Sequence, residues 1–340
     1  MRTKVILITG ANGEVGHGLI NQLSATPNMP PVMVLDIRGL DKSMQPKVYE
    51  TIVGDILDTG LLETLVSEYE IVAIFHLAAL LSTHSEFRPE AAHRVNVQGT
   101  VNLLQLAVEQ SRISGRPVKF IFPSSVAVYG MPDLATKNSV PPVKEDEFTM
   151  PTTMYGINKL YGEHIGRYYT HHYRQLADVP QRSGVDFRSL RFPGLISATT
   201  MPTGGTSDYA PEMLHAAAKG SPYACFVRPD TAIPFMAMPD AIRALLEIAD
   251  APREKLTRTV YNVTSFSLPA GDIADIVRGA FPSAQISFEP HPQRQGIVDS
   301  WCAQMDDSAA QRDWGWKPEY DMQRAFHDYL IPTIRKQYVP

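Results

Sequence analysis

The stretch KVILITGANGEVGHGL, residues 4–19, decides the fold of this chain. It begins with a continuous run of β-branched and aliphatic residues without polar alternation, which is typical of a strand buried on both faces of a parallel sheet. Gly10, Gly13 and Gly16 follow at once, and residues 14–24 then have the pattern of a helix. A strand that leads through this glycine spacing into a helix indicates a dinucleotide-binding turn, and the alternative is a purely structural glycine-rich turn.

Each glycine of this turn has its own physical task. The first permits the tight turn, the second allows the backbone to approach a pyrophosphate, and the third allows close packing of the helix on the sheet. The start of the helix then offers unpaired N–H groups and a partial positive charge to the phosphates. We therefore expect Gly10, Gly13 and Gly16 to hold a dinucleotide.

Strand and helix patterns alternate through the first two-thirds of the chain. Further strands are predicted at residues 31–37, 47–56, 71–79, 117–125 and 185–194, and helices at residues 58–69, at about 89–111 and around Tyr155. Such alternation predicts an α/β fold with a doubly wound parallel (Rossmann) sheet, covered by helices on both faces. Ligands of such a sheet bind at the carboxyl ends of its strands.

The pattern changes after Gly194. Residues 199–211 have no regular period, and short helices and strands follow to the end of the chain. We expect an NAD-binding Rossmann domain at residues 1–194 and a smaller mixed C-terminal lobe for the substrate at residues 195–340. Some segments of the second part are expected to return to the first domain.

Acidic side chains end two of the predicted strands. Asp36 lies 20 residues after Gly16, where a carboxylate accepts hydrogen bonds from the adenosine ribose and repels a 2′-phosphate, so NAD is favoured over NADP. Arg38 weakens this preference, because a nearby arginine accepts a 2′-phosphate. Asp55, in GDILD, either meets the adenine or caps the following turn.

Tyr155 and Lys159 lie one helical turn apart in TTMYGINKLYGEH. A tyrosine has a pKa of about 10, so it acts as a base near neutral pH only if a nearby positive charge stabilises its phenolate. The ammonium of Lys159 and an oxidised nicotinamide ring are expected to supply that charge. Ser124 and Ser125, at the end of a predicted strand, are expected to hold the substrate oxygen; the alternative is a surface helix without chemistry.

Composition excludes several classes of protein. The net charge is −5, so no basic surplus favours nucleic acid or an anionic membrane. No run of 18 apolar residues predicts a membrane span, and no signal peptide is expected. Cys225 and Cys302 show no metal-ligand spacing, so we expect no metal, reduced thiols and a cytoplasmic protein.

The motifs TGANGEVG, VLDIR, GDILD, HLAAL, NVQGT, PSSVAVYG and YGINK together resemble the extended short-chain dehydrogenases/reductases. The resemblance implies a triad of Ser125, Tyr155 and Lys159, with Asn96 shaping a proton path to the lysine; Asn96 could instead bond backbone within its own helix. The further cofactor contacts that it implies are Asn12, Glu14, Val15, Ile56, Leu77, Ala78, Ala79 and Pro193.

In the second half, SLRFPGLIS, TGGTSDYA, RQGIVDSW and RDWGWKPEYD are similar to the short-chain-type L-threonine 3-dehydrogenases. That similarity implies oxidation of the L-threonine β-hydroxyl, and a homodimer joined near residues 100–112 and 155–170. The substrate residues that it implies are Ser82, Ser125, Tyr155, Thr206 and Asp208.

Charged and aromatic side chains of the lobe have two interpretations. Asp208 pairs with an ammonium and Arg294 with a carboxylate, or both belong to structural ion pairs. Trp301 walls the pocket or lies in the core. Gly204 and Gly205 suit the hinge of a lid.

Three stretches depart from the family pattern. The segment between Ser125 and Tyr155 is longer than usual, residues 177–184 form an insertion, and His84 and Phe87 replace smaller or acidic residues near Ser82. The last of these departures bears on the choice of substrate.

Two other functions compete with threonine oxidation. A nucleotide-sugar epimerase or dehydratase uses the same triad but must neutralise a diphosphate, whereas residues 195–340 contain 13 Lys/Arg against 17 Asp/Glu. A catalytically inactive NAD-binding protein has no need of a tyrosine with an altered pKa.

Overall fold

The computed structural model describes residues 2–178, 182–202 and 205–338. Its centre is a seven-stranded sheet in the order β3-β2-β1-β4-β5-β6-β10, and every neighbouring pair of strands is parallel. The strands are β1 (Thr3–Thr9), β2 (Val32–Asp36), β3 (Glu50–Val53), β4 (Tyr69–His76), β5 (Val118–Ser125), β6 (Val185–Phe192) and β10 (Val260–Asn262). The predicted doubly wound α/β fold is confirmed.

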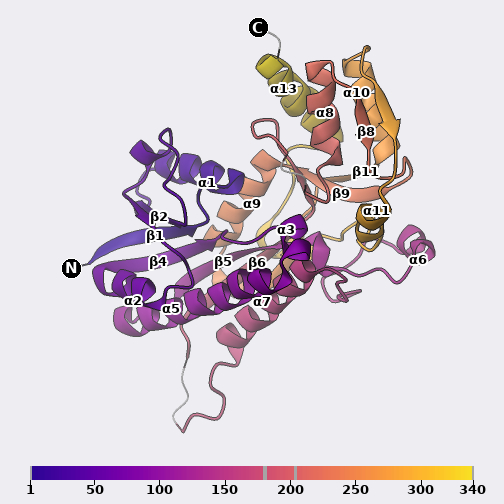
Figure 1. Cartoon of the computed structure of the whole chain (residues 1–340). Coiled ribbons are helices and arrows are strands. Elements are labelled where there is room, and N and C mark those ends of the chain that lie inside the picture. The colour runs from indigo at the N-terminus through magenta and orange to yellow at the C-terminus, as the bar shows by residue number, and fades with distance from the viewer. Residues whose placement is uncertain (1, 179–181, 203–204, 339–340) are drawn as a thin grey trace.

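Helices cover both faces of this sheet (Figure 1). On one face lie α2 (Thr59–Glu68), α5 (Gly99–Ser114) and α7 (Met154–His171), and on the other lie α1 (Glu14–Ala25) and α9 (Met238–Asp250). Strand β1 shows why its sequence lacks polar alternation. Its residues point alternately into the two cores, so both sets of side chains are buried and apolar.

Part of the second half of the chain returns to the large sheet. Strand β10 pairs with β6, and α9 packs beside α1, although both follow residue 194. Such returning segments were expected, because the chain leaves the sheet at β6 with that edge still unpaired. The division into residues 1–194 and 195–340 itself stays a prediction.

The predicted helix at residues 89–111 is a composite. It consists of α4 (Pro89–Ala92), the π-helical segment η2 (His93–Gln98) and α5, which continue one another without a break. Pro89 occupies the first turn, where a missing N–H costs nothing. A π-helical segment inside an α-helix often marks a functional position.

The smaller lobe lies beyond the carboxyl ends of the large sheet (Figure 1). It contains a mixed sheet of β7 (Gly194–Ile196), β9 (Ala232–Ala237) and β11 (Phe266–Pro269), and a parallel pair of β8 (Tyr223–Cys225) and β12 (Ile286–Phe288). Its helices include α8 (Tyr209–Lys219), α10 (Ala270–Ala280), α11 (Pro292–Asp299) and α13 (Ile331–Tyr338). One apolar core joins this lobe to Val126–Val128, the turn that follows β5, so the lobe is anchored beside the strand ends.

The remaining short elements connect these layers. They are α3 (Ser82–Phe87), α6 (Leu134–Ser139), α12 (Ser308–Trp314), the 3-10 turns Gln45–Lys47, Val126–Val128 and Arg253–Lys255, and the π-helical segment Arg324–Leu330. No helix within the described ranges is both long and apolar enough to cross a membrane.

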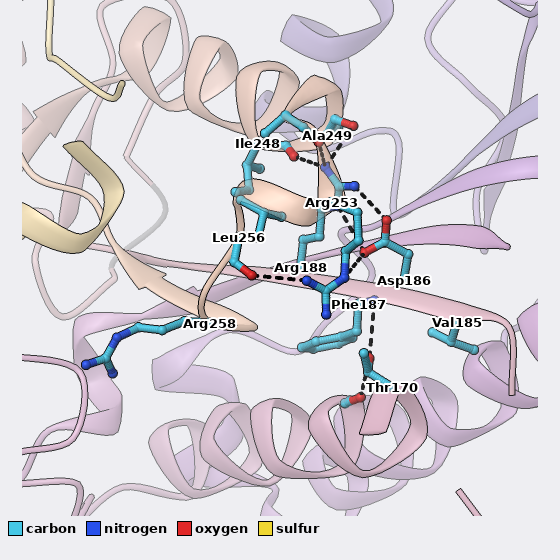
Figure 2. Close-up of polar contacts among 12 residues, drawn as sticks. Thr170, Val185, Asp186, Phe187, Arg188, Ile248, Ala249, Arg253, Leu256 and Arg258 are labelled. Atoms are coloured by element: carbon cyan, nitrogen blue, oxygen red, sulfur yellow. Dashed lines mark hydrogen bonds and ion pairs between the residues drawn. The ribbon is translucent and has the colours of Figure 1, made fainter. Parts of the chain in front are cut away.

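A buried arginine joins the start of β6 to the end of α9 (Figure 2). Arg188 donates to the carbonyl oxygens of Ile248 and Ala251, both at 2.6 Å, and forms a two-point ion pair with Asp186. The last carbonyls of a helix lack partners within it, and a cation satisfies both their hydrogen bonding and the helix dipole. This contact ties the returning helix α9 to the central sheet.

Candidate active site

The glycine-rich turn has the geometry that a dinucleotide requires. Gly10 has φ +68°, and a Cβ atom there would lie 2.6 Å from the Cα of Ala78; a Cβ at Gly16 would lie 2.3 Å from the carbonyl oxygen of Ala11. A Cβ at Gly13, in contrast, would meet nothing closer than 3.5 Å, so this glycine is not needed for internal packing. Gly13 caps α1 without a side-chain hydrogen bond. The first N–H groups of α1 lack partners within the helix, and donors of this kind suit a pyrophosphate.

The end of β2 is attached directly to this turn. The carboxylate of Asp36 accepts hydrogen bonds from the backbone N–H of Asn12 and from that of Arg38, both at 3.0 Å. The side chain of Asn12 in turn donates to the carbonyl oxygen of Gly39 at 2.9 Å. Asp36 thus lies where the ribose is expected, next to the backbone that would hold the phosphates.

The other expected cofactor contacts are placed in different ways. Ala78 lies against Gly10, and its N–H donates to the hydroxyl of Thr9 at 3.4 Å. Asp55 is exposed and accepts from the N–H of Leu57 at 3.0 Å, which is the turn-capping arrangement. The remaining predicted cofactor contacts stay predictions: Glu14, Val15, Ile56, Leu77, Ala79 and Pro193.

Tyr155 and Lys159 lie on the first turns of α7, as predicted from their spacing. Thr153 caps the helix by accepting from the N–H of Gly156 at 3.1 Å. A Cβ atom at Gly156 would lie 2.0 Å from the carbonyl oxygen of Ala127, so this glycine lets α7 pack against the turn that follows Ser125. The start of α7 therefore packs closely against the turn at the end of β5.

The ammonium of Lys159 is held in a nearly dry site. Its Nζ donates to the carbonyl oxygen of Pro123 at 2.7 Å, and lies 4.6 Å from the ring centre of Phe122 and 5.5 Å from that of Tyr155. Burial lowers the pKa of Lys159 to about 8, and the opposing effect of Glu163, one turn further along, is smaller. Burial also raises the pKa of Tyr155. Formation of a phenolate therefore depends on positive charge close to the ring.

Asn96 lies in the π-helical segment and reaches outside its own helix. Its side-chain oxygen accepts from the N–H of Leu80 at 2.8 Å, and its amide nitrogen donates to the carbonyl oxygen of Leu80 at 3.0 Å and to the side chain of Asn158 at 3.2 Å. Asn158 precedes Lys159. The structure thus brings Asn96 to α7, while its part in a proton path stays a prediction.

A buried histidine that sequence reasoning missed supports this arrangement. Thr100 donates to the carbonyl oxygen of Asn96 at 2.6 Å, so its hydroxyl accepts from Nε2 of His76 at 2.9 Å. The Nδ1 atom of His76 then accepts from the hydroxyl of Thr9 at 2.8 Å. Burial and, less strongly, Lys159 lower the pKa of His76 to about 3, which keeps the ring neutral. The motifs HLAAL and NVQGT contain three of these residues, His76, Asn96 and Thr100, and this was the available signal.

The two serines at the end of β5 have different surroundings. Ser125 accepts from the N–H of Ala127 at 3.2 Å, which leaves its own proton to be donated elsewhere. Ser124 is buried and donates to Glu163 at 2.6 Å, and Glu163 forms a two-point ion pair with Arg191 at 2.8 and 2.6 Å. Sequence reasoning missed this pair. Ser124 is thus committed to the protein interior, whereas Ser125 is partly exposed, and its contact with the substrate stays a prediction.

One of the predicted substrate residues of the lobe contacts α3. The hydroxyl of Thr206 donates to that of Ser82, on α3, at 3.2 Å. Arg294 donates to the carbonyl oxygen of Gly205 at 2.8 Å, and Asp208 accepts from the N–H of Gly205 at 2.6 Å. Gly204, the other expected hinge residue, lies outside the described residues.

Trp301 is buried in the apolar core of the lobe, and its indole nitrogen has no hydrogen-bond partner among the described residues. It follows α11 directly. The structure therefore agrees with the core interpretation of its ring, and a role as a pocket wall stays a prediction.

The altered stretch near Ser82 contacts α7 in an unexpected way. His84 is exposed, and Phe87 is 82% exposed. Glu86, between them, accepts from the N–H of Met154 at 2.7 Å and so satisfies a donor at the start of α7. This stretch therefore contacts the start of α7 through Glu86, and its two bulky side chains do not fill the interior.

The long segment between Ser125 and Tyr155 folds back on itself. The N–H of Gly130 donates to the carbonyl oxygen of Phe148 at 2.8 Å, and a Cβ atom at Gly130 would overlap the carbonyl of Met150. Residues 179–181 of the predicted insertion at 177–184 lie outside the described residues. No group of three or more potential metal ligands occurs in the part of the chain that the structure describes.

The sequence model of one protein family, described as the NAD dependent epimerase/dehydratase family, matches residues 6–264. The chain belongs to this family. The match includes the glycine-rich turn, Asp36 and the Tyr155–Lys159 pair, and it confirms the predicted membership of the extended short-chain dehydrogenases/reductases.

Relatives of this epimerase/dehydratase family member cover nearly all of its length. The mitochondrial L-threonine 3-dehydrogenase of Bos taurus is 35% identical over 320 residues, which cover 93% of this chain and 79% of the relative. The structure of L-threonine 3-dehydrogenase from Trypanosoma brucei has 34% identity and a TM-score of 0.85, and covers 99% of this chain and 98% of that one. A monomeric L-threonine 3-dehydrogenase from a metagenome database has 33% identity and a TM-score of 0.84, with 98% and 99% covered.

These matches confirm two predictions about this family member. It is an NAD-dependent oxidoreductase, and NAD is its cofactor. The start of α1 and the position of Asp36 fit that cofactor, because they offer backbone donors for a pyrophosphate and a carboxylate for a ribose.

Proposed function

We propose that this chain oxidises the β-hydroxyl group of L-threonine to the ketone of 2-amino-3-oxobutanoate, with NAD as the oxidant. The observation that carries the proposal is the similarity to L-threonine 3-dehydrogenases over nearly the whole chain. The position of Tyr155 and Lys159 at the carboxyl end of β5, on the side of the sheet where the glycine-rich turn follows β1, supports it chemically.

The protein's residues have distinct roles in this reaction. The phenolate of Tyr155 takes the proton of the β-hydroxyl, and Ser125 donates a hydrogen bond to the same oxygen. The ammonium of Lys159 favours the phenolate by its charge, and Pro123 holds that ammonium in place. Bound NAD supplies the acceptor for the hydride that leaves Cβ, and a positive nicotinamide ring.

The substrate is expected to lie between α3 and the turn of Thr206. Ser82 and Thr206 meet there, and Asp208 begins α8 close by. Short polar side chains and a carboxylate suit an ammonium group. In this arrangement Arg294 is engaged with Gly205, so it is not preformed as a partner for the substrate carboxylate.

A nucleotide-sugar epimerase or dehydratase is the second candidate, because the matching family includes such enzymes by its description. It requires cations for a diphosphate. Residues 195–340 contain fewer basic than acidic residues, which favours the amino acid.

The test is NADH formation measured with L-threonine, L-serine, 3-hydroxybutyrate and a UDP-sugar under identical conditions. A site that pairs the substrate's ammonium leaves buried polar groups unpaired with 3-hydroxybutyrate, so loss of the amino group should cost far more than loss of the methyl group, which costs about 1–3 kcal/mol. Equal turnover of 3-hydroxybutyrate and threonine, or turnover of the UDP-sugar alone, would contradict the proposal.

We also propose a cytoplasmic homodimer joined through the outer faces of α5 and α7. Along α7 the side chains of Ile157, Tyr161 and Tyr168 are 49%, 44% and 37% exposed. Such a row of exposed apolar side chains favours association with another surface. Analytical ultracentrifugation tests this: a single species at the mass of one chain would contradict it.

The unpaired thiols of Cys225 and Cys302 support a reducing compartment such as the cytoplasm.

A further inference from the structure

Arg294 occupies the junction between α11 and the turn Gly205–Asp208. Its guanidinium carbon lies 3.2 Å from the ring centre of Phe226, and its Nη2 atom donates to the carbonyl oxygen of Gly205 at 2.8 Å. We propose that Arg294 is a positioning residue that latches this turn over the substrate site, and that it is not the direct ligand of a substrate carboxylate. This inference rests on the proposed function and specifies how its site is closed.

Hydrogen bonds within the turn Gly205–Asp208 fix the position of Thr206 relative to Arg294. The carbonyl oxygen of Gly205 also accepts from the N–H of Asp208 at 3.2 Å, and the carboxylate of Asp208 accepts from the N–H of Gly205. A Cβ atom at Gly205 would lie 2.7 Å from that carboxylate, so the turn is closed tightly around its glycine. Between the two ends lies Thr206, which is buried and bonded to Ser82. Arg294 therefore sets where Thr206 meets the first domain.

Arginine is suited to this position by its shape. A planar guanidinium stacks on an aromatic face and still directs its N–H groups sideways to an acceptor, whereas an ammonium is a compact charge with no face. Phe226 is itself fixed, because its carbonyl oxygen accepts from the N–H of His291 at 2.9 Å, at the start of α11. Phe226, α11 and Arg294 thus form a rigid platform from which one hydrogen bond reaches the turn.

The chain offers a matched control for the chemical change. Arg335, on α13, also donates to a backbone carbonyl, that of Ala280, at 2.7 Å, and lies 5.1 Å from the ring centre of Phe281. Arg335→Lys removes the same kind of contact away from the substrate site. We expect Arg294→Lys, but not Arg335→Lys, to raise the KM for L-threonine about tenfold with kcat changed less, since one charged hydrogen bond is lost.

Two substrates separate a latch from a carboxylate ligand. L-threonine amide has no carboxylate, so a latch predicts the same increase in KM by Arg294→Lys for the amide as for L-threonine. If the increase disappears with the amide, Arg294 binds the carboxylate and the proposal is wrong. Thr206→Val gives a second check, because Arg294→Lys should add little to it if both act through the contact with Ser82.

Hydrogen exchange decides the same question without turnover. In the unliganded protein, Arg294→Lys should speed exchange of the amides of Gly205 and Asp208 severalfold, while Arg335→Lys leaves them unchanged. Unchanged exchange in Arg294→Lys would overturn the latch. If the parent protein does not oxidise L-threonine at all, the proposal that L-threonine is the substrate is wrong. The exchange rates of the Gly205 and Asp208 amides still test whether Arg294 holds the turn in place.

Discussion

The buried ammonium of Lys159 makes a quantitative prediction about stability and pH. The residue is 5% exposed, and burial lowers its pKa from the ordinary 10.5 to about 8. Below pH 8 both the folded and the unfolded chain carry the proton, so the folded state bears the full cost of the buried charge. Between pH 8 and 10.5 the unfolded chain binds more protons, and the free energy of unfolding therefore rises with pH.

The size of this effect follows from the two pKa values. Lowering the pKa of Lys159 from 10.5 to about 8 corresponds to about 3 kcal/mol of free energy. Lys159→Met keeps an unbranched apolar stem but removes the titrating group. It also removes the hydrogen bond to Pro123, which is worth about 1.5–3 kcal/mol, so the variant should be about as stable as the parent at pH 7. From pH 7 to pH 10 the parent should gain about 2.5 kcal/mol relative to the variant.

Urea unfolding of the parent and of Lys159→Met at pH 7, 8, 9 and 10 measures this difference. Lys137, whose pKa burial also lowers to about 8, is present in both proteins, so its contribution cancels. Lys42→Met is the control, because the exposed ammonium of Lys42 stays in water in both states, and its difference from the parent should not change with pH. A pH-independent difference between the parent and Lys159→Met would show that this ammonium is not desolvated, and would refute the reasoning.

Tyr155→Phe should lower kcat by about 10²–10⁴-fold and leave NAD affinity unchanged. Residual activity above a tenth of the parent's would contradict the role of Tyr155 as the proton acceptor. Asp36→Ala should narrow the preference for NAD over NADP, measured as the ratio of kcat/KM values; equal values in the parent would show that Asp36 does not face the ribose. Gly10→Ala adds a Cβ at 2.6 Å from Ala78 with φ +68°, so it should abolish NAD binding in calorimetry and cost at least about 1–2 kcal/mol, and unaltered binding would contradict the fit of the turn. Arg188→Met leaves the end of α9 without its cation, while Asp186 keeps Arg253 at 3.4 Å, so stability should fall by about 3 kcal/mol, the low end of the range for a broken buried ion pair; a change under about 1 kcal/mol in thermal unfolding would argue against it.

Local patterns in the sequence predicted the cofactor half of the site. The turn at Gly10–Gly16 and the helix pair Tyr155–Lys159 each depend on neighbours within one or two turns of chain. Asp36 required one further step, the general rule that ligands bind at the carboxyl ends of parallel strands. The structure places all of these at one end of the sheet.

The surroundings of individual polar groups were beyond the reach of such patterns. Ser124 and Ser125 are adjacent and chemically identical, yet Glu163 engages only the first, from a helix 39 residues away. Whether a hydroxyl faces the site or the interior depends on which side chains of other elements lie within about 3 Å. The spacing of residues along the chain does not contain these distances between side chains of different elements.

Sequence by itself determined the glycine-rich turn and the position of Tyr155 and Lys159 on one helix, because each follows from interactions between residues close in the chain. It determined the parallel sheet through the alternation of strand and helix patterns, since strands joined by helical crossovers pair in parallel. Tertiary structure alone decided that Arg294 meets Gly205, 89 residues away, that Ser82 meets Thr206, and that His76 supports Asn96 through Thr100. The physical reason is that burial and hydrogen bonding act over a few ångströms in space, and only packing of the whole chain brings these groups that close.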